Sequence, residues 1–375
     1  MKQETPEQLL MTVLHRAIGL MRPHGSVEEG SLLLSLAFDV RSFRLNTPMF
    51  VDPAGNLHVD MRAFDKRGRT PNTTLFVAHV DTVHRRSGVN VYDCTGPIWK
   101  AAGGQQLGAD DGAGVAVLSA LIRSGKAAYY IFTRGEECGG IGSKYLADEM
   151  PDVLEQFDRA VAFDRKDVFS IITHQGMGRC CSDVFAEALC TGLNDLGMMM
   201  MPDDTGIYTD TAEFVDFIPE CTNISAGYYR EHSQHESLDT TYLQQLAAAA
   251  IALDWDTMPV VREVGSWGDD DTDDLKYPDL APTVPFKEAA KGMKDLKAYL
   301  EARDADDARK AAAKAIVARA STPGVTQAEI NAAWDRWEAN DRPKRATTPG
   351  PVEPDDPFAW SEDGQTFHTG TKAMN

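Results

Sequence analysis

The chain has 375 residues, with 57 acidic and 37 basic side chains and a formal net charge of −20. Nucleic acid and anionic membrane surfaces are poor partners for such a chain, because both carry the same sign of charge. No run of about 18 apolar residues occurs, so a transmembrane helix is not expected. The length indicates one large domain with an appendage, or two domains.

The N-terminus and the cysteines indicate the cellular compartment of the protein. Residues 1–22 carry early charges and lack an apolar stretch followed by a small-residue cleavage site, which favours an amphipathic helix over a signal peptide. The six cysteines show no C-x-x-C spacing and are typical of reduced cytosolic thiols. We therefore expect a cytoplasmic protein.

Periodic apolar residues and turn signals divide the first 260 residues into alternating helices and strands. The predicted elements are, in chain order, helices at 5–22 and 27–38, strands at 57–59 and 74–78, a hairpin excursion at 84–106, a helix at 112–124, a strand at 128–133, a helix at 139–150, strands at 160–163 and 168–173, a helix at 182–196, a flexible apolar loop at 198–201, a short helix at 211–216, a strand at 221–226 and a helix at 241–253. The continuous apolar run at 74–78 is typical of a strand buried on both faces. We therefore predict an α/β fold, with a mostly parallel central sheet and helices on both of its faces.

The composition changes after the main domain, which we place at residues 1–260. Residues 261–286 are acidic and contain prolines, as linkers do. Residues 287–340 predict a helical appendage, with helices at 287–319 and 326–340, and residues 341–375 are polar and Pro-rich, which predicts disorder. Trp334 and Trp337 share one helical face and could dock the appendage on the main domain or on a second copy, so a homo-oligomer is one expectation.

Histidines and acidic residues recur where predicted strands end and helices begin. They are His79 and Asp81, Asp110 and Asp111 on a Gly-flanked turn, Glu136 and Glu137, Asp164, and the late pair His232 and Glu236. In an open parallel sheet, ligands gather outside the carboxyl ends of the strands. We therefore expect these side chains to meet at one site.

The residue types at this site suit a pair of metal ions. Imidazole and carboxylate ligands without sulfur are typical of zinc, although manganese and cobalt accept them too. Two divalent cations about 3.5–4 Å apart need a bridging carboxylate, and one aspartate of the DD turn would supply it. Asp81 would accept the ring N–H of His79. Of Glu136 and Glu137, one would bind metal and the other would act as general base, because neighbouring side chains point apart.

The motifs AHVDTV, LGADDGAGVA, TRGEECGGIGS, AFDR and EHSQHESLD together resemble the co-catalytic dizinc exopeptidases, a superfamily of amino-, carboxy- and dipeptidases with related deacylases. The resemblance covers roughly residues 5–258 and implies the phosphorylase/hydrolase-like fold of these enzymes. The interval 165–231 is too short for the lid domain that two-domain members insert there. The chain therefore resembles the compact, single-domain, aminopeptidase-like type.

The resemblance also implies a role for each motif residue. It makes His79 and Asp164 ligands of one metal, Asp110 the bridge, Glu137 and His232 further ligands, Glu136 the base and Asp81 the partner that orients His79. It implies a cis peptide bond between Asp110 and Asp111. His235 followed by Asp239 is an alternative register to His232 followed by Glu236. Thr209 and Asp210 match a segment that usually lies close to the substrate.

These observations predict a zinc metallopeptidase that hydrolyses peptide bonds by a metal-bound hydroxide. An exopeptidase is favoured, in particular an aminopeptidase acting on short peptides. An amidohydrolase that removes acyl groups from amino acids or cell-wall fragments would use the same ligands. A non-catalytic, metal-stabilised binding protein is the third hypothesis, and the intact Glu136 disfavours it. The loops at 84–106 and 197–209 are expected to contribute to the specificity pocket.

Overall fold

The computed structural model describes residues 4–176 and 178–264. The predicted C-terminal helices and disordered tail, and the linker from residue 265 onward, lie outside the described residues. Within them, no helix combines the length and the apolar character that crossing a membrane requires.

Seven α-helices and two 3-10 helices occur in the described part of the chain. They are α1 (Pro6–Ile18), α2 (Val27–Phe43), α3 (Ala109–Ser124), α4 (Ile141–Glu149), α5 (Pro151–Leu154), α6 (Asp183–Asp195), η1 (Asp210–Phe214), α7 (Thr240–Ala252) and η2 (Trp255–Thr257). Their ends follow local capping chemistry. Thr5 and Gln8 form a capping box at α1, Ser26 caps α2, and Gly125 ends α3 in the left-handed conformation.

The strands of the described residues form one large sheet and three small ones. The large sheet has the order β13-β10-β14-β9-β4-β8-β3-β2, and its centre, β14-β9-β4-β8, is parallel. The strands are β1 (Leu20–Met21), β2 (Met49–Val51), β3 (Leu57–Asp60), β4 (Thr74–His79), β5 (Gly88–Val89), β6 (Tyr92–Asp93), β7 (Ile98–Ala101), β8 (Tyr129–Thr133), β9 (Arg159–Arg165), β10 (Ser170–Ile172), β11 (His174–Gln175), β12 (Gly178–Arg179), β13 (Met201–Asp203), β14 (Glu220–Ser225), β15 (Tyr228–Tyr229) and β16 (Ser237–Asp239).

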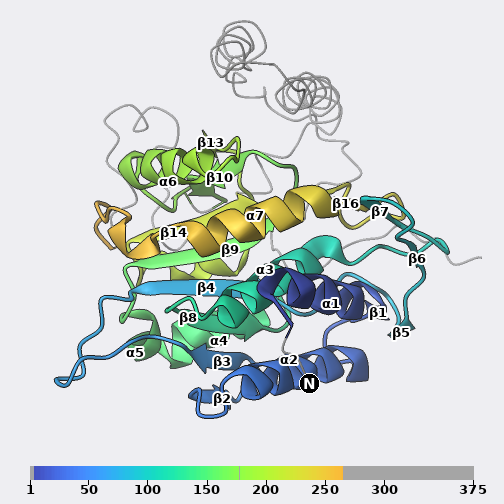
Figure 1. Ribbon diagram of the computed structural model, residues 1–375, viewed down its shortest axis with the longest axis horizontal. Helices are drawn as coiled ribbons and strands as arrows, with labels where there is room; N and C mark the ends of the chain where they lie inside the picture. The colour runs from blue at the N-terminus through green and yellow to red at the C-terminus, as the bar shows by residue number, and fades with distance from the viewer. Residues whose placement is uncertain (1–3, 177, 265–375) are drawn as a thin grey trace, which may run out of the picture. The chain divides into compact units, whose positions relative to one another are not determined.

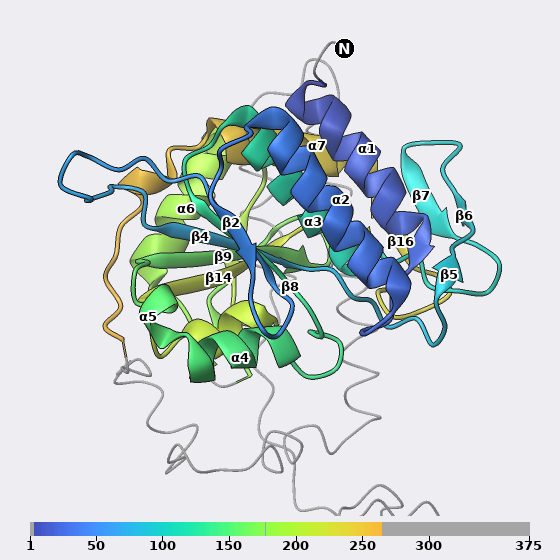
Figure 2. The ribbon, with the colours of Figure 1, turned by 90° about the horizontal axis from the view of Figure 1, so that it is seen from below.

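Helices cover both faces of the central sheet. Helices α1, α2, α3 and α7 lie on one face and α4 and α5 on the other (Figure 2). Strand β4 shows the consequence, because Phe76 and Ala78 point into one apolar core while Leu75 and Val77 point into the other. The α/β fold with a mostly parallel sheet and helices on both faces is thus confirmed.

Several details differ from the sequence prediction. Residues 198–200 form a loop as predicted, but Met198 and Met200 are buried, and Met201 begins β13, which pairs with β10 at the edge of the sheet. Helix α2 continues to Phe43, five residues beyond its predicted end. The edge strand β2 and the antiparallel pairing of β3 with β8 were not predicted.

The predicted excursion at 84–106 contains an antiparallel hairpin of β6 and β7. Strand β7 pairs with β16, and β16 pairs with β15, so a second, four-stranded sheet forms beside the large one (Figure 1). The loop between β15 and β16 carries His232. The excursion therefore anchors a predicted ligand loop whose own sequence has little apolar content.

Candidate active site

The predicted site residues meet at the carboxyl ends of the central parallel strands. His79 is the last residue of β4, and Asp164 is the penultimate residue of β9, rather than following these strands as predicted. Glu136 and Glu137 follow β8, and Asp110 lies in the first turn of α3. This placement follows from the parallel arrangement, which brings the same end of each strand to one edge.

The two carboxylate oxygens of Asp110 face two different histidines. Its Oδ1 lies 3.1 Å from Nε2 of His79, and its Oδ2 lies 3.1 Å from Nε2 of His232. One carboxylate between two imidazoles is the arrangement that a bridging ligand requires.

Each histidine has a second carboxylate beside it. Nε2 of His79 is 3.6 Å from Oδ1 of Asp164, and Nε2 of His232 is 3.1 Å from Oε1 of Glu137. Two ligand atoms about 2.1 Å from a tetrahedral ion lie roughly 3.4 Å apart, so both spacings fit a shared metal. Oε1 of Glu137 is buried, and no donor of the described residues is aligned with it for a hydrogen bond. The residues present therefore fit two metal ions.

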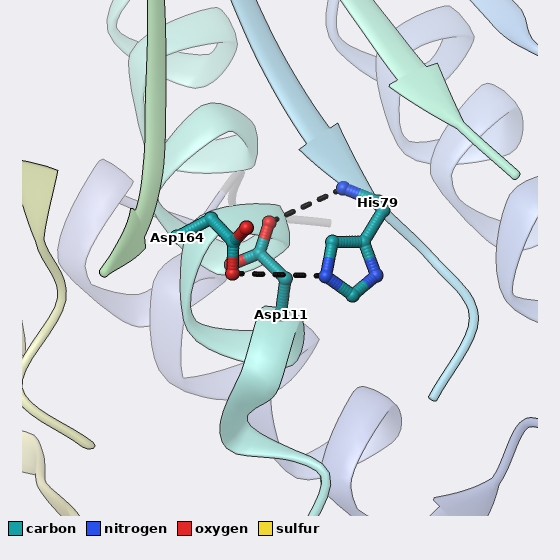
Figure 3. A group of neighbouring side chains, drawn as sticks. All are labelled: His79, Asp111 and Asp164. Carbon is teal, nitrogen blue, oxygen red and sulfur yellow. Dashed lines mark hydrogen bonds and ion pairs between the residues drawn. The ribbon is translucent and has the colours of Figure 1, made fainter. Parts of the chain in front are cut away.

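Asp111 lies close to His79 and Asp164 as well, and Figure 3 shows the three side chains together. However, its Oδ2 accepts a hydrogen bond from the backbone amide of His79 at 3.2 Å, and its Oδ1 accepts one from the amide of Gly114 at 2.9 Å. A Cβ at position 114 would collide with this carboxylate. Because both oxygens are engaged by the backbone, the geometry favours a supporting role for Asp111. The peptide bond between Asp110 and Asp111 is cis, as the resemblance implied.

Asp81 contacts the turn that carries the two glutamates. Its carboxylate accepts hydrogen bonds from the backbone amides of Gly135 at 2.8 Å, Glu136 at 3.1 Å and Glu137 at 3.2 Å. The ring Nδ1 of His79 lies nearer to the backbone carbonyl oxygen of Asp81, at 3.2 Å, than to its carboxylate Oδ1, at 3.5 Å. The predicted contact between the Asp81 carboxylate and the His79 imidazole is thus present, and the same carboxylate also holds three backbone amides.

Two hydroxyl groups hold Asp164. The Thr209 hydroxyl donates to its Oδ2 at 2.6 Å, and the Tyr228 hydroxyl donates to its Oδ1 at 3.0 Å. Thr209 belongs to a segment that the sequence had singled out. Tyr228 was missed, since a tyrosine in a two-residue strand carries no signal in the sequence alone.

The family model described as peptidase family M28 matches residues 56–251, slightly more than half of the chain. The chain belongs to peptidase family M28. The matched residues include every predicted metal ligand and Glu136. The prediction that this chain is a metallopeptidase, which hydrolyses peptide bonds, is thus confirmed by its family.

Solved structures share the fold of this M28 chain at low sequence identity. Aminopeptidase PepT from Bacillus cereus is 15% identical, with 65% of this chain and 97% of that chain covered and a TM-score of 0.55. A tripeptidase from Staphylococcus aureus is 14% identical, with 65% and 96% covered and a TM-score of 0.54. The TET1 peptidase of Pyrococcus horikoshii is 15% identical, with 64% and 98% covered and a TM-score of 0.51. A search of curated protein sequences found no match.

The M28 site gathers more acidic groups than its own side chains neutralise. Burial and the charge of Asp164 raise the pKa of Glu136 to about 10, and burial and the charge of Asp110 raise the pKa of Asp164 to about 7. The neighbouring carboxylates of Asp110 and Glu137 raise the pKa of His232 to about 11. Buried carboxylates that lie close together raise one another's pKa, and they raise the pKa of a neighbouring imidazole. Divalent ions bound between these groups would stabilise the ionised carboxylates.

Proposed function

We propose that this M28 chain is a zinc aminopeptidase, which uses two metal ions to remove residues from the N-terminus of short peptides. The observation that carries the proposal is the position of Asp110 between His79 and His232. A single metal would need only one of the two oxygens. The orientation of both toward separate histidines supports a pair.

The donor set divides into two groups that share Asp110. His79 and Asp164 would hold one ion, and Glu137 and His232 would hold the other. When bound, such ions lower the pKa of water and polarise the carbonyl group that is attacked. Nitrogen and oxygen donors at these spacings support zinc.

Glu136 is the residue that would move protons. Its Oε2 lies 3.9 Å from Nε2 of His79, so its carboxylate faces the ligand cluster without taking part in either group. Asp81 fixes the backbone on which Glu136 stands. In this position Glu136 can take a proton from the attacking water and give it to the departing amine.

The preference for free N-termini rests on the similar structures, which include one described as an aminopeptidase and one described as a tripeptidase. We also propose a cytoplasmic location, which the six unpaired cysteines support. A homo-oligomer is part of the proposal as well. The TET1 peptidase is described as assembling into a tetrahedron or a large octahedral shell.

Purified protein is expected to hold two zinc ions per chain and to cleave di- and tripeptides with a free amino group. The measurement is elemental analysis combined with a peptide panel in which each substrate is also supplied in N-acetylated form. Removal of the metal by a chelator should reduce cleavage to the background rate, and zinc should restore it. Faster cleavage of the N-acylated series would favour the amidohydrolase, and a metal-loaded protein that hydrolyses nothing would favour the binding protein.

Replacing His232 and His235 one at a time tests which of the two histidines is the metal ligand. His232→Ala is expected to lose one of the two metals, because Nε2 of His232 faces Asp110 and Glu137. His235→Ala is the matched control, since His235 is exposed on the same loop and should keep both metals. Metal content per chain after dialysis gives the answer. A loss confined to His235→Ala would assign the ligand to the alternative register.

A further inference from the structure

Glu236 accepts hydrogen bonds from four consecutive backbone amides. Its Oε2 is 2.8 Å from the amide nitrogen of Leu107 and 3.1 Å from that of Gly108. Its Oε1 is 2.8 Å from the amide nitrogen of Ala109 and 3.2 Å from that of Asp110. One buried carboxylate thus binds the entire turn that ends at the bridging aspartate.

The turn needs an acceptor that its own sequence does not supply. Helix α3 begins here, and the first amides of a helix have no partner within it. The N-cap residue is Gly108, which has no side chain to accept them. Leu107 and Ala109 are fully buried, so bulk water does not reach these amides. A negative charge at this end of the helix is also favoured by the helix dipole.

Other side chains hold the carbonyl oxygens of the same turn. Arg22 donates to the oxygen of Gly108 at 3.5 Å, and Asn90 donates to that of Leu107 at 3.0 Å. These donors leave the amides of the turn to Glu236. In the described part of the chain, Glu236 is the only carboxylate with hydrogen bonds to them.

Glu236 also lies on the loop that carries His232, four residues further along the chain. Its backbone oxygen accepts the amide of Ala101 in β7 at 2.9 Å, which ties the loop to the second sheet. The Glu236 side chain therefore connects two segments that meet only through tertiary structure. One segment provides Asp110 and the other provides His232.

We propose that Glu236 is a positioning residue, which fixes Asp110 relative to His232 and so sets the affinity of the metal site formed by Asp110, Glu137 and His232. This inference rests on the proposed dizinc centre. Residues that orient metal ligands typically change metal affinity by about 10–100-fold when they are replaced. Glutamine in place of Glu236 would keep one acceptor oxygen but present an NH₂ group to amide donors.

Glu220 offers a matched control within the same chain. It is fully buried and accepts the backbone amides of Ser182 at 2.7 Å, Val261 at 2.8 Å and Arg262 at 3.0 Å. It stands at the first residue of β14, whereas the metal ligands gather at the opposite ends of the parallel strands. Glu220→Gln should therefore disturb a similar cluster of amides without moving a ligand.

The experiment is a zinc titration of the full chain against a chromophoric chelator, for the wild type, Glu236→Gln, Glu236→Asp and Glu220→Gln. All are measured well below their unfolding temperatures. The wild type should bind two zinc ions. Glu236→Gln should bind one of them about 10–100-fold more weakly, while Glu220→Gln keeps both wild-type affinities. Glu236→Asp keeps the charge but is one methylene shorter, so an intermediate loss is expected.

Each result decides between the hypotheses. Two wild-type affinities in Glu236→Gln would overturn the role of Glu236 and leave the dizinc proposal standing. An equal loss of zinc affinity in Glu220→Gln would mean that the effect comes from general destabilisation, and it would also overturn the positioning role of Glu236. A wild type that binds no zinc would overturn the dizinc centre and this inference together. If Glu236→Gln does not fold, Glu236→Asp carries the test, and wild-type affinity in that variant contradicts the inference.

Discussion

Glu136→Gln is expected to lower kcat by about 10²–10⁴-fold, which is the usual contribution of a general base. Glutamine has nearly the same shape as glutamate, but its amide cannot take a proton from the attacking water. Neither proposed metal group includes Glu136, whose Oε2 lies 3.9 Å from Nε2 of His79. The metal content should therefore stay at the wild-type level. Steady-state kinetics and elemental analysis of the same preparation measure both quantities.

The matched control for this variant is Glu149→Gln, because Glu149 is an exposed glutamate at the last residue of α4. It should keep both turnover and metal. Wild-type turnover in Glu136→Gln would remove the assignment of Glu136 as the base. A combined loss of metal and turnover would instead make Glu136 a ligand and return the question of the base to Glu137.

The second large effect is expected from the two neighbouring aspartates of the DD turn. Asp110→Asn should lose at least one metal per chain and nearly all activity, because an amide offers only one oxygen where two are needed. Asp111→Asn should keep both metals but lower the free energy of unfolding by about 1–3 kcal/mol, the typical effect of leaving a buried amide without its acceptor. Metal content and urea denaturation curves distinguish the two outcomes.

The reverse pattern would exchange the roles of these residues. If Asp111→Asn lost metal while Asp110→Asn retained it, Asp111 would be the bridge, as its proximity to His79 and Asp164 would then suggest. If both variants lost metal and kept the wild-type free energy of unfolding, both aspartates would be metal ligands, and Asp111 would not act only as an acceptor for backbone amides.

The general outline of the fold could be predicted from local patterns. Strand β4 was recognisable because its continuous apolar run fits burial on both faces, and the two cores on either side explain that run. The polar residues at the strand ends could be grouped because parallel strands bring their carboxyl ends to one edge. The burial of Met198 and Met200 could not be predicted this way, since it depends on packing against core residues that are distant in the sequence.

The ligand types and their approximate place were readable in the sequence, because residue chemistry and apolar periodicity are local properties. The different environments of the two DD aspartates depend on distant partners, since Asp110 faces His79 and His232 while Asp111 accepts the His79 amide. The same holds for Asp81, whose carboxylate contacts the predicted imidazole and also accepts hydrogen bonds from the amides of residues 135–137. Which partner a carboxylate oxygen faces is set by the three-dimensional path of the backbone, which no spacing within one segment encodes.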